Sequence, residues 1–208
     1  MVTEGGIPVK TILFDMYGVI IVESKGNFIP YTLSRFPKSE HERLMKIGID
    51  LFTKAGNGEI GSDEFLSALG YDDPQFHMRD YIENQLTMDG DFYVFAEKMK
   101  EKYKYALLSN DVSEWSRHIT GFYKLDQYLP VKIVSADAGC RKPDPRIYEI
   151  ALERLGVPAG DCVFIDNSVE NLRTAEKRGM DTIFFKRDGE EYDGKIVNSF
   201  DELYEMLK

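Results

Sequence analysis

The stretch TILFDMYG, residues 11–18, decides the fold, because an apolar run ends there on a carboxylate. Residues 11–14 show no clean alternation of apolar and polar side chains, which is typical of a strand covered on both faces in a parallel sheet. Asp15 follows this run directly. A carboxylate at the end of a buried strand costs free energy unless another group pairs with it or uses it. We therefore expect Asp15 to have a function.

Four further apolar runs follow along the chain, at residues 105–108, 131–134, 162–165 and 182–185. Helices are predicted between and after the later runs, and three segments carry the signals for them. These are residues 144–155, with Asp144 as N-cap, Pro145 in the first turn and Gly156 as the stop; a segment from Ser168 to before Gly179; and one from Ser199, which forms a capping box with Glu202. Strands that alternate with helices form βαβ units. The sequence therefore predicts an α/β fold with a Rossmann-like parallel sheet of about five strands.

The segment between the first two predicted strands breaks this rhythm, because it is long and mostly helical. Ser39 and Glu42 predict a capping box, and apolar side chains then recur at helical spacing. The pair Asp73-Pro74 predicts the start of another helix. We expect a small α-helical cap domain inserted after the first strand. The expected division is a core of residues 1–17 and 104–208, with a flap and helical cap at residues 18–103.

Composition limits the partners and the compartment. The 208 residues suffice for one core and a small accessory domain. A net charge of −10 argues against nucleic acid and anionic membranes as partners, and no apolar run approaches the roughly 18–20 residues that span a bilayer. Residues 1–10 are interpreted as a short disordered lead-in and not as a secretory signal, and Cys140 and Cys162 lack the CxxC spacing of zinc or redox sites. We expect a cytoplasmic protein, whose oligomeric state the sequence does not indicate.

Polar side chains follow four of the predicted strands, at the edge where the reactive groups of open α/β sheets gather. In chain order they are Asp15 and Tyr17, Ser109 and Asn110, Lys142, and Asp166, Asn167 and Glu170. Arg141, beside Lys142, is expected to be solvated, as most charged side chains are.

These residue types together point to phosphate chemistry. Asp15 and Asp166 would repel each other unless a cation lay between them. Oxygen ligands with room for water suit Mg²⁺, and Mg²⁺ with Lys142 would supply the positive charge that an anionic substrate needs. Ser109 and backbone amides could hold phosphoryl oxygens. Asp15 would then attack phosphorus and form an aspartyl-phosphate.

Four segments, in order and each after a predicted strand, resemble the motifs of the haloacid dehalogenase-like (HAD) superfamily. They are FDMYGV, LLSN, CRKPDPRIY and VFIDNSVEN, and the helical insert lies where that superfamily has a helical cap. The patterns GEI-x₃-EF, RKP-x₂-RIY and DN-x₂-EN resemble most closely a subgroup of small bacterial sugar-phosphate phosphatases. The resemblance implies a hydrolase that acts on a small phosphorylated molecule.

The resemblance also implies a role for each candidate residue. Asp15 is the expected nucleophile and Lys142 offsets negative charge on nucleophile and substrate. Ser109 binds the transferring group, and Asn110, from the same motif, joins the catalytic set. The expected metal ligands are Asp15, Asp166 and the backbone carbonyl of Tyr17, with Asn167 and Glu170 positioning metal-bound waters.

Tyr17 departs from the phosphatase pattern, which has a second Asp two residues after the nucleophile. A tyrosine with a pKa near 10 is a poor general base at neutral pH. Three hypotheses stay open: a phosphatase without the usual acid/base residue, a metal-free 2-haloacid dehalogenase, and a non-catalytic binding protein. Dehalogenases typically have Tyr at this position, but they lack an acidic residue in place of Asp166. They also need an Asp where this chain has Asn171 and an arginine at the cap entrance, for which Arg35 is a loose candidate.

Overall fold

The computed structural model describes residues 10–208 of the chain. Its centre is a six-stranded sheet in the order β3-β2-β1-β4-β5-β6, in which every neighbouring pair is parallel. The predicted α/β fold is therefore confirmed. The strands are β1 (Lys10–Phe14), β2 (Tyr103–Ser109), β3 (Val131–Val134), β4 (Cys162–Asp166), β5 (Asp181–Phe185) and β6 (Lys195–Val197).

Each of the five predicted apolar runs lies within a strand, whereas β6 was not predicted. This short edge strand pairs only with β5, and Lys195 and Ile196 are exposed in it. An edge strand that is not covered on both faces has no continuous apolar run, which explains why the pattern missed it. Most of the predicted disordered lead-in lies outside the described residues, and Lys10 already belongs to β1.

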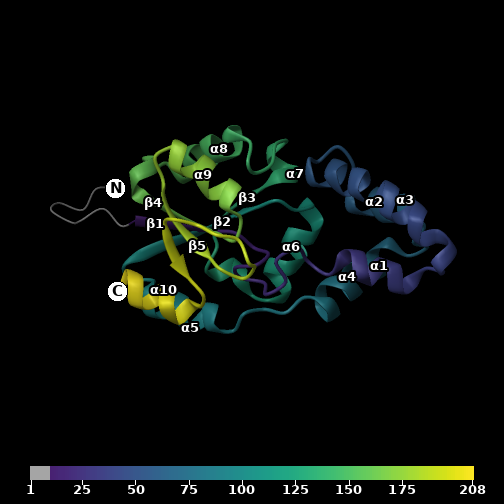
Figure 1. The fold of residues 1–208 in the computed structure, drawn as a ribbon, viewed down its shortest axis with the longest axis horizontal. Coiled ribbons are helices and arrows are strands. Elements are labelled where there is room, and N and C mark those ends of the chain that lie inside the picture. Colours follow the sequence, from purple (N-terminus) through teal and green to yellow (C-terminus); the bar gives the residue numbers. More distant parts are fainter. Residues whose placement is uncertain (1–9) are drawn as a thin grey trace.

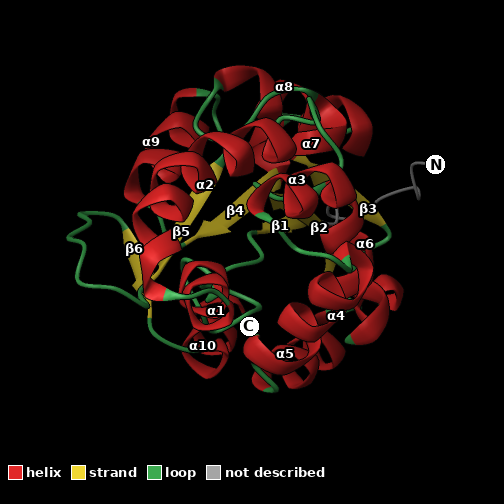
Figure 2. Cartoon of the chain, turned by 90° about the vertical axis from the view of Figure 1, so that its right-hand side faces the viewer, coloured by secondary structure: helices red, strands yellow, loops and turns green. Residues whose placement is uncertain are grey.

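Helices cover both faces of the sheet, as Figure 2 shows with α8 and α9 above the strands and α5 and α10 below them. Leu13 of β1 packs in one apolar cluster with α8 and α9, while its neighbours Ile12 and Phe14 pack in a second cluster with α5, α6 and α10. The covering helices are α5 (Asp91–Met99), α6 (Ser113–Phe122), α8 (Pro145–Leu155), α9 (Val169–Lys177) and α10 (Phe200–Leu207).

Local signals set where the core helices begin and end. The carboxylate of Asp144 accepts a hydrogen bond from the amide of Arg146 at 2.9 Å, and Gly156 ends the helix in the left-handed region at φ 66°. Ser199 accepts from the amide of Glu202 at 3.2 Å, as predicted. The Glu202 carboxylate instead accepts from the amide of Asn198, one residue earlier than a complete capping box requires.

Four helices form the cap, at the end of the molecule opposite β1 and the C-terminus (Figure 1). They are α1 (Phe28–Arg35), α2 (His41–Gly56), α3 (Ser62–Leu69) and α4 (Pro74–Gln85). The prediction for α4 is confirmed, because the Asp73 carboxylate accepts from the amide of Phe76 at 3.0 Å. The predicted capping box of Ser39 and Glu42 is wrong. Ser39 lies within a 3₁₀ turn that runs directly into α2, so no extended N-cap residue precedes that helix.

Helix α5 lies within the insert expected at residues 18–103, yet it packs on the sheet. Phe92 and Phe95 of α5 make edge-on ring contacts with Phe14 of β1, with centroids 5.5 and 6.1 Å apart. We therefore propose a cap limited to α1–α4, with a boundary near Gln85 in place of residue 103.

Short turns complete the chain. They are α7 (Ser135–Ala138) and the 3₁₀ helices Lys38–Glu40, Leu125–Gln127 and Ala159–Asp161.

Over residues 10–208, no helix has both the length and the apolar character that a bilayer crossing requires. Cys140 and Cys162 are both buried and carry free thiols.

Replacing Phe14 with alanine should destabilise the protein strongly, because its fully buried ring contacts the rings of Phe92, Phe95, Tyr105 and Phe200. We expect the free energy of unfolding to fall by about 3–5 kcal/mol in urea titrations. The matched control is Phe76→Ala on α4, whose side chain is 49% exposed and whose loss should cost about 1 kcal/mol or less. Equal losses in the two variants would contradict this account of the core.

Candidate active site

The carboxyl ends of β1, β2 and β4 open into a cavity of about 340 Å³ between the core and the cap. The core contributes its floor and one wall, and the cap contributes aromatic side chains to the other wall. Among the lining residues are Asp15, Tyr17, Asn110, Lys142, Asn167 and Asn171 from the core, and Phe28, Phe52 and Tyr81 from the insert. The cavity lies at the edge of the sheet where the sequence predicts the reactive groups to meet.

A single ammonium group joins the two carboxylates at the floor of this cavity. The Lys142 Nζ lies 2.7 Å from Asp15 Oδ1 and 2.7 Å from Asp166 Oδ2. Parallel pairing explains the closeness of the acids, because Phe14 of β1 is opposite Ile165 of β4 and each acid is the next residue. Since both oxygens contact one atom, the two carboxylates are near enough to share a cation.

Burial and charge shift the protonation of this trio. Burial and the nearby negative charge of Asp166 raise the pKa of Asp15 to about 7, against the opposing effects of Lys142 and of the Met16 amide. Burial lowers the pKa of Lys142, but the charges of Asp15 and Asp166 outweigh it and hold that pKa above its ordinary value. With all three groups ionised the trio keeps one excess negative charge, which a further cation would neutralise.

Asp166 is fully buried and is fixed by groups that follow it in the chain. The amide of Ser168 donates to its Oδ1 at 2.7 Å, and the Asn171 Nδ2 lies 3.2 and 3.1 Å from its two oxygens. From the sequence, Asn171 is notable only as the position where a dehalogenase has an Asp. Its neutral amide instead donates to the carboxylate and holds it in place.

The two residues after β2 have different surroundings. The Asn110 side chain donates to the Lys142 carbonyl at 2.9 Å and accepts from the Lys142 amide at 2.8 Å, so it fixes the backbone that carries the ammonium. The Ser109 hydroxyl is fully buried and has no hydrogen-bond partner within residues 10–208. An unpaired buried hydroxyl costs free energy, which an oxygen atom of a ligand could recover.

Tyr17 contacts a buried acid that sequence reasoning missed. The Tyr17 hydroxyl donates to Asp111 Oδ1 at 3.4 Å, and Asp111 is fully buried. Burial raises the pKa of Asp111 to about 8, and burial together with the charge of Asp111 raises that of Tyr17 well above 10. The available signal was its position, since Asp111 is the third polar residue in a row at the end of β2.

Of the two residues predicted to position metal-bound waters, one lines the cavity and the other does not. Asn167 lines the cavity and packs on Gly18, whose φ is 82° and where an added Cβ would lie 2.2 Å from Asn167 Nδ2. This contact explains why a glycine follows Tyr17. Glu170 is exposed on the first turn of α9 and is not among the residues that line the cavity. Asp188 and Glu190, which were not predicted, do line it.

The donors present fit a magnesium ion with few protein ligands. Within residues 10–208, no cluster of three or more His, Cys, Asp or Glu side chains is placed to hold a metal. Magnesium usually binds through one or two carboxylates and keeps several waters. Asp15, which lines the cavity, and the fully buried Asp166 behind it provide two such carboxylates, and the Tyr17 carbonyl is the predicted third oxygen.

The expectation that Arg141 is solvated is wrong. Its side chain is only partly exposed and lines the active-site cavity, and burial lowers the pKa of its guanidinium. Within residues 10–208 it forms no ion pair with an Asp or Glu. A half-buried cation without an anion beside it is suited to an anionic ligand. Its place before Lys142 was visible, but its orientation depends on the cap.

Comparisons with known proteins agree with this fold. The profile of the haloacid dehalogenase-like hydrolases matches residues 9–179. The (S)-2-haloacid dehalogenase 4A of Burkholderia cepacia is 36% identical over 118 residues, which span 53% of this chain and 51% of that protein. A HAD phosphatase structure from Thermococcus onnurineus has a TM-score of 0.76 at 22% identity and covers 95% of this chain and 97% of that one. A HAD-family enzyme from Bacteroides thetaiotaomicron, in complex with magnesium and inorganic phosphate, has a TM-score of 0.73 at 22% identity over 89% of this chain and 98% of that one.

These likenesses carry different weight. The two solved structures share too little sequence with this chain to show more than its fold. The chain spans about half the length of the curated dehalogenase, so the activity of that protein is not transferred. The family profile covers most of the chain, including the four motifs and the cap. The chain therefore belongs to the haloacid dehalogenase-like hydrolase family.

Proposed function

We propose that this hydrolase is a magnesium-dependent phosphatase of a small phosphate monoester, and that it acts through an aspartyl-phosphate on Asp15. The observation that carries the proposal is the Lys142 ammonium held 2.7 Å from the carboxylates of both Asp15 and Asp166. An arrangement of two acids and one base leaves a negative charge for a divalent cation to neutralise. The magnesium and phosphate bound to the Bacteroides thetaiotaomicron enzyme support the same chemistry here.

The proposed reaction uses the residues at the cavity floor. A carboxylate oxygen of Asp15 attacks phosphorus, the bond from phosphorus to the ester oxygen breaks, and the leaving group departs with that electron pair as a phenolate or alkoxide, which takes a proton from water. Lys142 offsets charge on the nucleophile and on the phosphoryl oxygens, and the unpaired Ser109 hydroxyl donates to one of them. A water molecule then attacks phosphorus, the bond from phosphorus to the Asp15 oxygen breaks, and the products are inorganic phosphate, the Asp15 carboxylate and a proton that passes to solvent. Bound Mg²⁺, held by Asp15, Asp166 and the Tyr17 carbonyl, would stabilise negative charge on the phosphoryl group.

The Tyr17 hydroxyl limits which phosphate esters the proposed enzyme hydrolyses rapidly. Its raised pKa means that the hydroxyl keeps its proton at neutral pH, so it does not act as the general base that activates water. A leaving group that needs no protonation, such as a phenol or an anomeric sugar oxygen, is then favoured over a simple alkoxide. Sugar phosphates, predicted from the motif resemblance, stay candidates for this reason.

A second candidate is 2-haloacid dehalogenase chemistry, which the 36% identity to the Burkholderia cepacia enzyme favours. Two features oppose it. Asp166 is an acid where the dehalogenase pattern has none, and Asn171 donates to that acid where the pattern needs a water-activating Asp. Arg35, the loose candidate for a carboxylate clamp, is already paired with Asp80 at 2.5 Å. A non-catalytic binding role, for which Tyr17 is the argument, is the third possibility.

Two broader expectations also stay proposals. The substrate is a small molecule, since the cavity has a volume of about 340 Å³, a polar floor and aromatic walls. A reducing cytoplasm is the expected compartment, and the two free, buried cysteines support it.

Asp15→Asn should remove phosphatase activity. We expect hydrolysis of 4-nitrophenyl phosphate with Mg²⁺ to fall by roughly 10⁴-fold or more, because the amide is not a nucleophile. EDTA should abolish wild-type activity, and Mg²⁺ should restore it. Asp72→Asn, an exposed position in the loop after α3, is the matched control and should keep wild-type activity. Activity that survives Asp15→Asn, or halide release from 2-chloropropionate that ignores EDTA, would refute the proposal.

Asp111→Asn should make the protein relatively more stable as the pH rises. The pKa of Asp111 is about 8 when folded and near 3.8 when exposed, so between about pH 4 and pH 8 only the folded state keeps the proton. In that window the wild type should lose up to about 1.4 kcal/mol per pH unit relative to the variant, which does not titrate there. Urea unfolding of both proteins across the window measures the difference. The exposed control Asp72→Asn should show no such trend. A stability difference between wild type and Asp111→Asn that does not change with pH would contradict the raised pKa of Asp111.

A further inference from the structure

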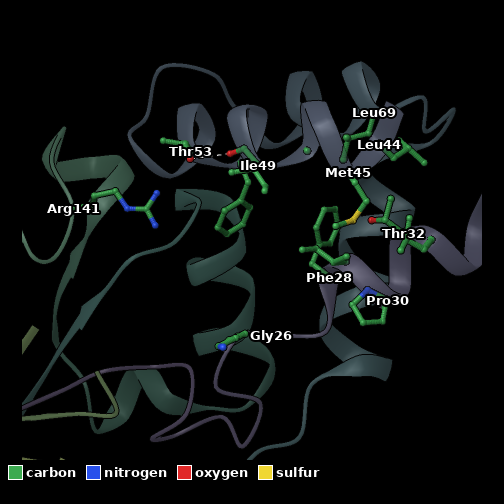
Figure 3. Close-up of a pocket in the computed structure, with 15 residues that line it drawn as sticks. Gly26, Phe28, Pro30, Thr32, Leu44, Met45, Ile49, Thr53, Leu69 and Arg141 are labelled. Atoms are coloured by element: carbon green, nitrogen blue, oxygen red, sulfur yellow. Dashed lines mark hydrogen bonds between the residues drawn. The ribbon is translucent and has the colours of Figure 1, made fainter. Parts of the chain in front are cut away.

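A second cavity, of about 520 Å³, lies within the cap between α1 and α2. Its lining is mostly apolar and comes mainly from these two helices, with Leu69 from α3 and with Lys25 and Arg141 at one end. Figure 3 shows Arg141 at one end of this cavity and Leu44, Leu69 and Thr32 at the other, with Met45, Ile49 and Phe28 between. We call this cavity the cap groove. Among residues 10–208, none of those that line it is an Asp or Glu.

The cap groove has several exposed apolar side chains next to one another, which is unusual for a protein surface. Ile29, Met45 and Ile49 line it and are 48%, 43% and 65% exposed. Such side chains occur singly on most protein surfaces, but a contiguous apolar patch marks a binding site. These three come from two neighbouring helices and face one cavity, so water covers apolar surface there that a ligand could bury.

The cap groove is continuous with the active-site cavity. Five residues line both cavities, namely Lys25, Gly26, Phe28, Phe52 and Arg141. Two of these are cations, and within residues 10–208 neither forms an ion pair. These shared residues form a junction between the two cavities, and its two cations favour an anionic group there. Asp15 lies on one side of the junction, and the apolar lining of the cap groove lies on the other.

We propose that the substrate is an amphiphilic phosphate monoester, with its phosphoryl group at Asp15 and an apolar alkyl or aryl chain in the cap groove. This inference rests on the proposed phosphatase function and narrows it, because a sugar has no apolar chain to fill the groove. A ligand that is anionic at one end and apolar along its length matches the cationic junction and the lining together. A second protein chain would match the apolar lining but not the cavity that leads to Asp15.

Gly48 offers a way to fill the groove without disturbing the fold. It lines the groove from α2, and a Cβ added there would meet only Leu69 Cδ2, at 4.0 Å. Both alanine and leucine are better helix formers than glycine. Gly48→Leu therefore blocks the groove, and Gly48→Ala is the matched control that changes the same helix position but leaves the groove open.

The test is the affinity of alkylphosphonates of increasing chain length, from methyl to octyl, for the full chain with Mg²⁺. Trp115 is the single tryptophan, and its ring lies 5.0 Å from that of Phe28 and 6.2 Å from that of Phe52, so its fluorescence reports binding. In the wild type and in Gly48→Ala, each methylene should tighten binding by up to about fourfold. In Gly48→Leu the chain-length dependence should vanish, while the affinity for methylphosphonate stays unchanged.

The outcomes separate this inference from the proposed function. Affinities that do not change with chain length, or a dependence that Gly48→Leu leaves intact, would overturn the inference even if 4-nitrophenyl phosphate is hydrolysed. A dependence that Gly48→Leu removes, in a protein that hydrolyses no phosphate ester, would uphold the groove and overturn the phosphatase. Self-association in sedimentation that Gly48→Leu abolishes without any ligand would make the groove an interface between copies and overturn the inference.

Discussion

The structure depends on one buried ammonium that contacts two buried carboxylates. Burial of ionised groups is expensive unless they are paired, and here one base is paired with two acids. Burial, together with the nearby charge of Asp166, raises the pKa of Asp15 to about 7, so this carboxyl is poised between holding a proton and holding a cation. A site of this kind gains stability from bound positive charge. The same positive charge is what a phosphoryl group needs when it approaches an acidic protein.

The sheet and the cap divide the work of building the site. Parallel pairing of β1 with β4 sets the two acids side by side, and the Asn110 side chain fixes the backbone of Lys142. The insert adds aromatic walls and the cap groove, which determine what can approach Asp15. In the proposed phosphatase, the chemistry is therefore carried out by core residues, and the choice of substrate is set mainly by the cap.

Much of the core could be predicted from sequence because buried strands and helix caps leave local patterns. Five strands, the N-cap of Asp144 and the residues that gather around Asp15 all follow from such patterns. Other features depend on contacts between distant segments. Asp111 looks like a turn residue until burial is known, Arg141 looks solvated until the cap is placed over it, and the exposure of Glu170 is visible only once α9 is oriented. The edge strand β6 and the start of α2 lack a distinctive local signal.

The covalent step can be observed directly by acid quenching during hydrolysis of 4-nitrophenyl phosphate with Mg²⁺, followed by mass spectrometry of the peptide that contains Asp15. The account predicts that this peptide gains the mass of one phosphoryl group during turnover, that fragmentation assigns the group to Asp15, and that EDTA prevents it. Turnover with an unmodified Asp15, or with the phosphoryl group on another residue, would contradict the central claim.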